Sequence, residues 1–240
     1  MSGGFKNKPK ILRGAFVELG LSLPPLVVVF QFNPLQLTRN RSISYAPPND
    51  KFICPPCPEE EEPRKVTKWN NNLTEYHKNT DDIFEIRDNQ RVSIDEESIN
   101  LELRFDATED FSSGDSIAVR FGILPRLATL EMMVYPKGEG LLGKALRSQG
   151  GFSFTKGENP PMILFIWGHS RVLPVNINSM NITETEFNTL LYPIRAIVSV
   201  SLTVIEGKNI PYTYSKAAKE AMAVLNLANI TEVANVTIPG

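Results

Sequence analysis

Two cysteines, Cys54 and Cys57, are the first residues of this sequence whose types and spacing could do chemistry. A Cys-x-x-Cys pair can supply half of a zinc site or a redox-active disulfide. Zinc needs two further ligands, and the nearest donors along the chain are His77 and the acidic run Glu59 to Glu62. A redox pair is expected at a helix start after a strand, whereas prolines and glutamates surround this pair. We therefore interpret both the pair and the acidic run as solvated loop, and we predict no metal and no cofactor.

The remaining polar candidates favour structural roles. His169 follows a glycine at the end of an apolar run, and no Ser, Cys or Asp partner stands at an informative spacing. Asp106, Glu109, Asp110 and Asp115 cluster around one loop, but their spacing does not match a calcium-binding EF-hand. The sequence contains no P-loop, nucleophile elbow or zinc-protease helix. We predict that the protein is not an enzyme.

Composition excludes several other classes. The chain has 240 residues, a net charge of −2 and a pI of about 5.8, so no basic surface for nucleic acid is expected. No apolar run approaches the roughly 20 residues of a membrane span. The N-terminus is polar and basic and no hydrophobic signal core follows it, so we expect synthesis and folding in the cytoplasm. Two cysteines are too few for a disulfide-framed domain.

The elements that would position any site are mainly strands. Residues 194–205 alternate, with Val198, Val200 and Leu202 on an apolar side and Ser199 and Thr203 on a polar side. Successive side chains of a strand point to opposite faces, so this pattern predicts one long, half-buried strand. We expect it to line a channel, with its polar face, which includes Ser201, toward water.

Other segments show weaker strand patterns. The ranges predicted as strands are 11–19, 26–32, 35–45, 99–105, 162–167 and 171–182. Residues 183–191 are expected to form a link with a helical turn, and residues 82–91 are ambiguous. Loops are predicted at 110–114 and 137–160.

Two helices and one insertion complete this interpretation. Residues 116–135 carry apolar side chains at helical spacing, and Pro125 predicts a break near Leu124. Residues 215–228 predict a second helix capped by Ser215. Residues 46–80 contain two Pro-Pro pairs, the acidic run and an Asn-rich patch, and they have little periodicity. We predict that they leave the core as a peripheral contact arm.

Several ordered segments together resemble the tube-protein family of contractile injection systems, in particular the branch of spike–tube adaptors. The matching segments are Phe30-Gln31-Phe32-Asn33-Pro34, Leu101 to Asp106, Gly122 to Pro125 with Leu130-Glu131, Pro160-Pro161 before Ile163 to Phe165, Trp167-Gly168, Phe187, and Pro193 to Ala196. The resemblance covers roughly residues 11–205.

This resemblance implies a mainly β (α+β) fold. The expected form is a two-sheet β-barrel or sandwich of the phage tail-tube type, with one main helix and a C-terminal helix. Residues 1–207 would form the tube-like domain, with its polar, acidic insertion at about 46–80. Residues 208–240 would form a helical extension, which is too short for the peptidoglycan-binding-like module that adaptors often carry.

The resemblance also implies a structural role in a phage-tail-like contractile particle. The chain would form a ring, expected to be a hexamer, that connects the inner tube to the baseplate spike or hub. Its partners would be tube, spike or hub, and baseplate proteins, without nucleic acid or a membrane span. The particle would be assembled in the cytoplasm and then released or attached to a membrane. Two alternatives stay open: another tube-fold component, such as a tube initiator or terminator, and a free-standing binding module.

Overall fold

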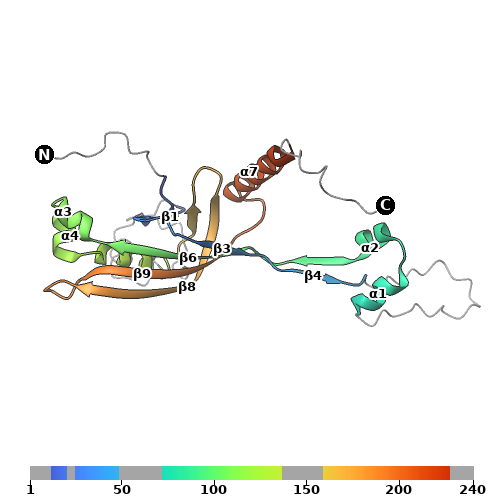
Figure 1. Ribbon diagram of the computed structural model, residues 1–240, viewed down its shortest axis with the longest axis horizontal. Coiled ribbons are helices and arrows are strands. Elements are labelled where there is room, and N and C mark those ends of the chain that lie inside the picture. The colour runs from blue at the N-terminus through green and yellow to red at the C-terminus, as the bar shows by residue number, and fades with distance from the viewer. Residues whose placement is uncertain (1–11, 21–24, 49–71, 137–158, 228–240) are drawn as a thin grey trace, which may run out of the picture. The chain divides into compact units, whose positions relative to one another are not determined.

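The computed structural model of the chain describes residues 12–20, 25–48, 72–136 and 159–227. The chain divides into two compact units: unit 1 comprises residues 1–40 and 98–240, and unit 2 comprises residues 41–97. Figure 1 labels the elements of both units. Unit 2 is an insertion, because the residues on either side of it, Asn40 and Ser98, are cross-strand partners within unit 1.

Unit 1 is organised around a seven-stranded antiparallel sheet with the order β2-β1-β7-β8-β9-β6-β3. The strands are β1 (Ala15–Glu18), β2 (Val27–Val29), β3 (Leu37–Asn40), β6 (Ser98–Asp106), β7 (Ile163–Ile166), β8 (Val172–Phe187) and β9 (Pro193–Val204). The fold is mainly β with helices, as expected. The sheet is not a closed barrel, because β2 and β3 remain as its two edges.

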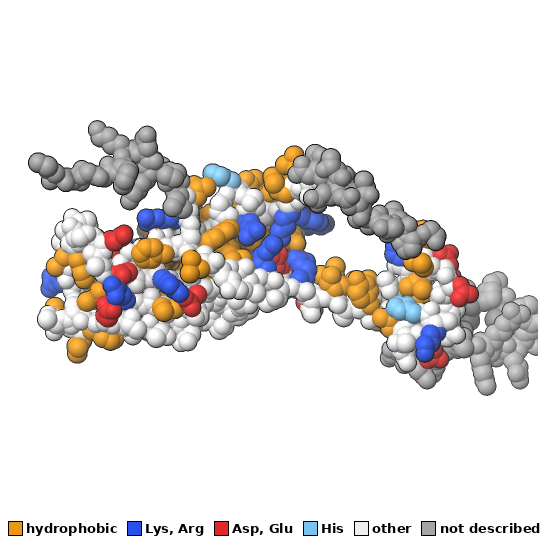
Figure 2. Space-filling view, viewed as in Figure 1, with side chains coloured by type: hydrophobic (Ala, Val, Ile, Leu, Met, Phe, Trp, Pro, Cys, Tyr) orange, Lys and Arg blue, Asp and Glu red, His pale blue; other side chains and the backbone are white. Residues whose placement is uncertain are grey.

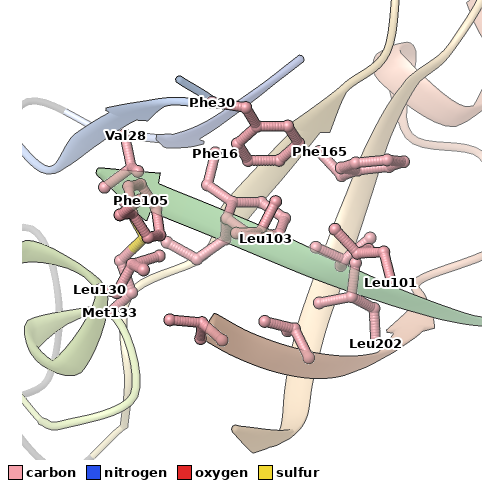
Figure 3. Close-up of a cluster of buried hydrophobic side chains, with 14 of the residues drawn as sticks. Phe16, Val28, Phe30, Leu101, Leu103, Phe105, Leu130, Met133, Phe165 and Leu202 are labelled. Carbon is pink, nitrogen blue, oxygen red and sulfur yellow. The ribbon is translucent and has the colours of Figure 1, made fainter. Parts of the chain in front are cut away.

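One apolar core fills the inner side of this sheet. Figure 3 shows Phe16 and Phe30, from β1 and the end of β2, pointing toward Leu103 of β6. Leu130 and Met133 complete the cluster from the helical side. Strands β1 and β6 are not neighbours in the sheet, so the sheet must curve around a shared core. Burying side chains of this size supplies the main stabilisation of the unit, roughly 1.5–3 kcal/mol for each one.

The helices of unit 1 differ from the predicted ones in their bounds. They are α3 (Thr108–Ser112), α4 (Ser116–Phe121), α5 (Leu124–Met132) and α7 (Ile210–Leu227). The loop predicted at 110–114 is wrong, since α3 covers most of it. The break predicted near Leu124 is confirmed, but its cause is Gly122, which has a φ of 59°. Pro125 lies in the first turn of α5. Backbone N–H groups there have no partner within the helix, so the missing N–H of proline costs no hydrogen bond.

The C-terminal helix begins earlier than predicted. It starts at Ile210, and the side chain of Asn209 accepts a hydrogen bond from the N–H of Tyr212. Ser215 is therefore not a cap. It is fully buried, and its hydroxyl bonds both the N–H and the C=O of Val172 at the start of β8.

Two strand predictions also need correction. The single strand predicted over 35–45 is two strands, since β3 ends at Asn40 and the next strand begins at Ile43 in unit 2. The helical turn predicted within 183–191 is wrong for its first half, because β8 continues to Phe187. A tight turn at residues 188–192 then leads into β9.

Unit 2 contains two strands and two short helices in its described part. Strands β4 (Ile43–Ala46) and β5 (Arg91–Ile94) pair in an antiparallel ribbon, and α1 (Leu73–Asn79) and α2 (Ile83–Asn89) lie between them in sequence. Asn72 and Asp82 cap these helices through their side chains. The ambiguous range 82–91 is thus mostly α2. Cys54, Cys57 and the acidic run lie outside the described residues, as does nearly all of the loop predicted at 137–160.

Candidate functional site

The outer face of the long strands is the candidate functional surface. In β9 the side chains of Val198, Val200 and Leu202 are buried, while Ser199 is exposed and Ser201 is half-buried. The predicted alternation of the strand is therefore confirmed. Its polar side faces away from the core of unit 1.

Strands β6 and β8 extend this polar side on both flanks of β9. Residues directly opposite each other in an antiparallel pair share a face of the sheet, so the register defines the surface. Glu102 and Asn181 lie opposite Ser199, and Asn100 and Ser179 lie opposite Ser201. The small polar residues of this face, called here the polar face, are Thr38, Asn40, Ser98, Asn100, Asn176, Asn178, Ser179, Asn181, Thr183, Thr185, Ser199, Ser201 and Thr203.

A β-bulge at Asn178 keeps β8 in phase with this face. The pairing shifts between Ile177 and Ser179, so Asn178 is an extra residue on β8. Its amide donates a 2.6 Å hydrogen bond to the hydroxyl of Thr203. Without this extra residue, every later side chain of β8 would point to the opposite side. The bulge therefore places Met180 against the core and Ser179 on the polar face.

Charged residues gather at one end of the polar face and are paired there. Arg195 donates to Asp106 at 2.8 Å and to Glu186 at 2.6 Å, which joins β9 to both neighbouring strands. Arg104 pairs with Glu102 at 3.1 Å within β6. The other end of the polar face presents hydroxyl and amide groups only, so its surface carries no formal charge.

The pKa of Asp106 reflects its place in this network. Partial burial on its own would raise the pKa of the carboxyl. Hydrogen bonds from the hydroxyl and the N–H of Thr108, together with the Arg195 guanidinium, outweigh burial and lower the pKa below its ordinary value. The same contact with Asp106, followed by the charge of Glu186, raises the pKa of Arg195. Both groups stay ionised at neutral pH.

A joint at this end fixes the long strands to the rest of unit 1. The amide of Gln31 donates to the C=O of Asp106 at 2.5 Å and accepts from its N–H at 2.8 Å, so a side chain continues the ladder of β6. Arg126 of α5 donates to the same amide oxygen. Asn33 bonds both the N–H of Gly14 and the C=O of Leu12.

Gly122 completes this joint from the helical side. A Cβ atom at this position would lie 2.1 Å from the carbonyl oxygen of Pro193, and the N–H of Ile123 donates to that same oxygen at 2.9 Å. Only glycine allows the α4–α5 corner to approach the start of β9 so closely at a positive φ. Four separate segments of the resemblance meet at this joint. They contribute Phe30-to-Pro34, Asp106, Gly122 and Pro193.

The polar residues singled out in the sequence occupy ordinary structural positions. His77 is exposed on α1, and His169 is exposed and accepts a hydrogen bond at its backbone from Tyr214. Asp110 pairs with Arg126 at 2.9 Å, and Asp115 caps α4. Among the described residues, no group of three or more His, Cys, Asp or Glu side chains is placed to hold a metal ion.

Two features of the surface were missed by the sequence analysis. The first is the bulge, whose signal is the consecutive polar pair Asn178-Ser179 in an otherwise alternating run. The second is the turn at residues 188–192. Its Leu190 and Leu191 are exposed, and no periodic pattern in the sequence predicts that exposure.

Comparison with known proteins assigns no family. No protein-family model matches the chain, and no curated protein matches it. Within the part of the chain that the structure describes, no helix is both long and apolar enough to cross a bilayer.

Proposed function

We propose that the chain is a structural, non-catalytic component of a phage-tail-like contractile particle. In this role, copies of the chain form a ring that connects the inner tube to the baseplate spike or hub, and the polar face lines the channel of that ring. The observation that carries the proposal is the polar face itself, because it spans three long strands while their other side forms the core.

The chemistry of the polar face suits a surface past which another protein moves. Small hydroxyl and amide groups hold water without presenting an unpaired charge, so they offer a passing protein few strong contacts. The ion pairs at one end are internal to the face, which leaves little charge to attract a polyanion or a polycation. A wetted, neutral wall of this kind supports the channel assignment.

The joint around Gln31 and Gly122 supports the resemblance from which the assignment came. The matching segments are scattered over more than 160 residues, yet several of them contact one another at the start of β9. The resemblance therefore falls on residues that build one joint of this chain, and this convergence is what supports the proposal. The tube-type fold and the adaptor position are part of the proposal.

Assembly with the particle's own tube and hub proteins tests this function. We expect electron microscopy of the co-expressed proteins to show rings that contain this chain between the tube and the hub. A chain that stays separate from both proteins under all conditions would contradict the proposal and favour a free-standing binding module.

Labelling of single cysteines tests the orientation of the polar face. In a background with Cys54→Ser and Cys57→Ser, Ser199→Cys should react with a bulky maleimide in the free protein and be protected in the ring. Glu131→Cys, which is exposed on α5, is the matched control and should react in both states. Equal protection at both positions, or none at Ser199→Cys, would show that the polar face does not line a closed channel.

A further inference from the structure

One end of unit 1 displays several exposed apolar side chains. Ile117 and Val119 of α4 and Phe187, Leu190 and Leu191 of the β8–β9 turn are each at least half exposed. We call these five residues the tip patch. Figure 2 shows hydrophobic side chains at the end of unit 1 where this turn and α4 lie in Figure 1.

The tip patch is held rigidly by one asparagine. The side-chain oxygen of Asn188 accepts from the N–H groups of Leu190 and Tyr192, each at 2.9 Å, and its amide group donates to the C=O of Arg120 in α4. The rings of Phe121 and Tyr192 meet edge to face across the same contact. The turn and α4 are therefore fixed to each other next to these exposed apolar side chains.

Leu191 occupies a position of the turn whose backbone conformation does not suit a leucine. Its φ is 63°, in the left-handed region that a bulky side chain rarely adopts, and its side chain is 80% exposed. Glycine or asparagine would suit this backbone better. An exposed leucine held in an unfavourable conformation indicates that its side chain is needed for a contact outside the chain.

The charges around the tip patch restrict what can cover it. Asp106 and Glu186 share Arg195, and Asp110 pairs with Arg126. The other charged residues of ranges 106–121 and 184–195, which frame the patch, are Glu109, Asp115, Glu184 and Arg120, a net charge of −2. Two such ends repel each other, and they also repel an anionic lipid surface. A protein surface that is both apolar and basic is the complementary occupant.

Helix α7 offers such a surface at the other end of β8. Its exposed apolar residues are Ile210, Tyr214, Met222, Val224 and Leu225, called here the α7 face. Four of them recur at helical spacing along one stripe. Residues 206–226, which include the carboxylate of Glu206 bonded to Tyr212 of α7, contain three lysines and two glutamates, a net charge of +1. Because Ser215 bonds the start of β8 and the tip follows its end, the two surfaces lie at opposite ends of that strand (Figure 1).

We propose that copies of this chain associate head to tail, with the tip patch of one copy seated on the α7 face of the next. Such a contact is heterologous: each copy uses two different surfaces and can bind one neighbour at each end. A ring of copies also needs a heterologous contact, so this inference rests on the proposed function and names the two surfaces that make the contact. Each surface is small, so a single contact is expected to be weak, with a Kd of about 10 µM or more.

Analytical ultracentrifugation of the full chain tests the contact. We expect wild type to associate as its concentration rises, and Leu191→Asn to raise the Kd at least about tenfold, as loss of a central apolar contact does. The same substitution should raise the Tm by about 2–4 °C, because asparagine tolerates the positive φ. Two control variants should associate like wild type. Leu191→Met keeps the apolar side chain, and Leu35→Asn changes a 91% exposed leucine that lies outside both surfaces.

A mixing experiment separates head-to-tail contact from symmetric contact. Val224→Gln/Leu225→Gln removes the α7 face but keeps the tip patch, and Leu191→Asn does the reverse. Each variant alone should be monomeric, whereas an equimolar mixture should form a one-to-one dimer. Association of the α7 variant alone would show tip-to-tip contact and overturn the proposal.

Three further outcomes would also overturn it. They are a wild-type chain that stays monomeric, unchanged association of Leu191→Asn, and tip-dependent sedimentation of a monomer with vesicles of phosphatidylcholine and phosphatidylglycerol. None of these depends on ring formation with tube or hub proteins, so failure here leaves the proposed function to its own test.

Discussion

Unit 1 and unit 2 both contain antiparallel strands, but they differ in how far the apolar side of those strands is buried. In unit 1, the long strands turn one side inward, and the apolar residues of β6 and β9 are nearly all buried. In unit 2, the ribbon of β4 and β5 places Ile43 opposite Ile94 and Tyr45 opposite Val92, and all four side chains are about half exposed. A two-stranded ribbon buries its apolar side only where a further layer packs against it.

The two units also differ in charge. Residues 41–97 contain thirteen acidic and eight basic residues, a net charge of −5, whereas the rest of the chain carries +3. In the described part of unit 2, Tyr76 is the sole large hydrophobic residue that is buried. Alternation alone therefore does not make a core, because the strands also need something that packs against their apolar side.

The strongest test of this difference is a charge placed on each side of β9. Val200→Asp puts an unpaired carboxylate in the core, which costs about 4 kcal/mol or more and should abolish folding. Ser201→Asp places the same charge on the polar face and should change the unfolding free energy by less than about 1 kcal/mol. Urea unfolding followed by circular dichroism measures both, and the reverse order would invert the assigned faces.

The next largest effect is expected at the joint of unit 1. Gly122→Ala adds a Cβ atom that overlaps the carbonyl oxygen of Pro193, so we expect a loss of about 3 kcal/mol or more. Gly114→Ala is the matched control, since Gly114 also has a positive φ but nothing lies within 4 Å of the added atom. It should cost about 1 kcal/mol. Equal losses in thermal denaturation would show that the close approach adds nothing to the backbone strain.

A smaller effect is expected for the ion pair between Asp106 and Arg195. Asp106→Asn should lower the unfolding free energy at pH 7 by about 0.5–1 kcal/mol, because the pair is partly exposed. The folded-state pKa of Asp106 is lowered, so its contribution is complete above the unfolded pKa of about 4 and is lost as the pH falls through the folded value. Denaturant titrations should therefore show wild type and variant converging below about pH 4. A constant gap down to pH 2.5 would exclude this linkage.

The smallest effect on unit 1 is expected from the removal of unit 2. Asn40 and Ser98 pair directly, so an Asn-Gly dipeptide in place of residues 41–97 can close β3 and β6 as a tight hairpin. The Tm of unit 1 should change by less than about 3 °C, which corresponds to roughly 1 kcal/mol. Any binding of tube or hub proteins through the predicted contact arm should be lost. Unfolding of the shortened chain would show that the two units are one cooperative structure.

Sequence patterns predict those parts of unit 1 in which local period and burial agree. The strands β6 and β9 alternate, with the exposed Ile197 as the main exception, because each has one buried side, so their extents and faces follow from the sequence. The length of β8 does not follow from the sequence. The bulge at Asn178 shifts the alternation of polar and apolar residues by one position halfway along the strand. The division at residues 41–42 is equally hidden, because the alternation continues from β3 into β4 although the strands belong to different units.

The candidate surface shows the same limit. Ser199, Ser201 and Thr203 are predictable from the period of β9, but their neighbours on β6 and β8 follow from the register, which depends on contacts distant in sequence. Ser215 resembles an N-cap locally, yet its hydroxyl bonds a strand that lies 43 residues earlier. The strain at Leu191 depends on backbone geometry, which a list of residue types does not contain.

The strand order has a consequence for how the chain acquires its structure during synthesis. Strand β1 leaves the ribosome before its partner β7, which lies nearly 150 residues further along the chain. At ordinary translation rates this interval lasts about 7–30 s, during which Phe16 and Val28 have no sheet to cover them. Non-local pairing of this kind also slows folding after release. The segment that holds β1 and β2 is therefore expected to expose apolar side chains until β7 has been synthesised.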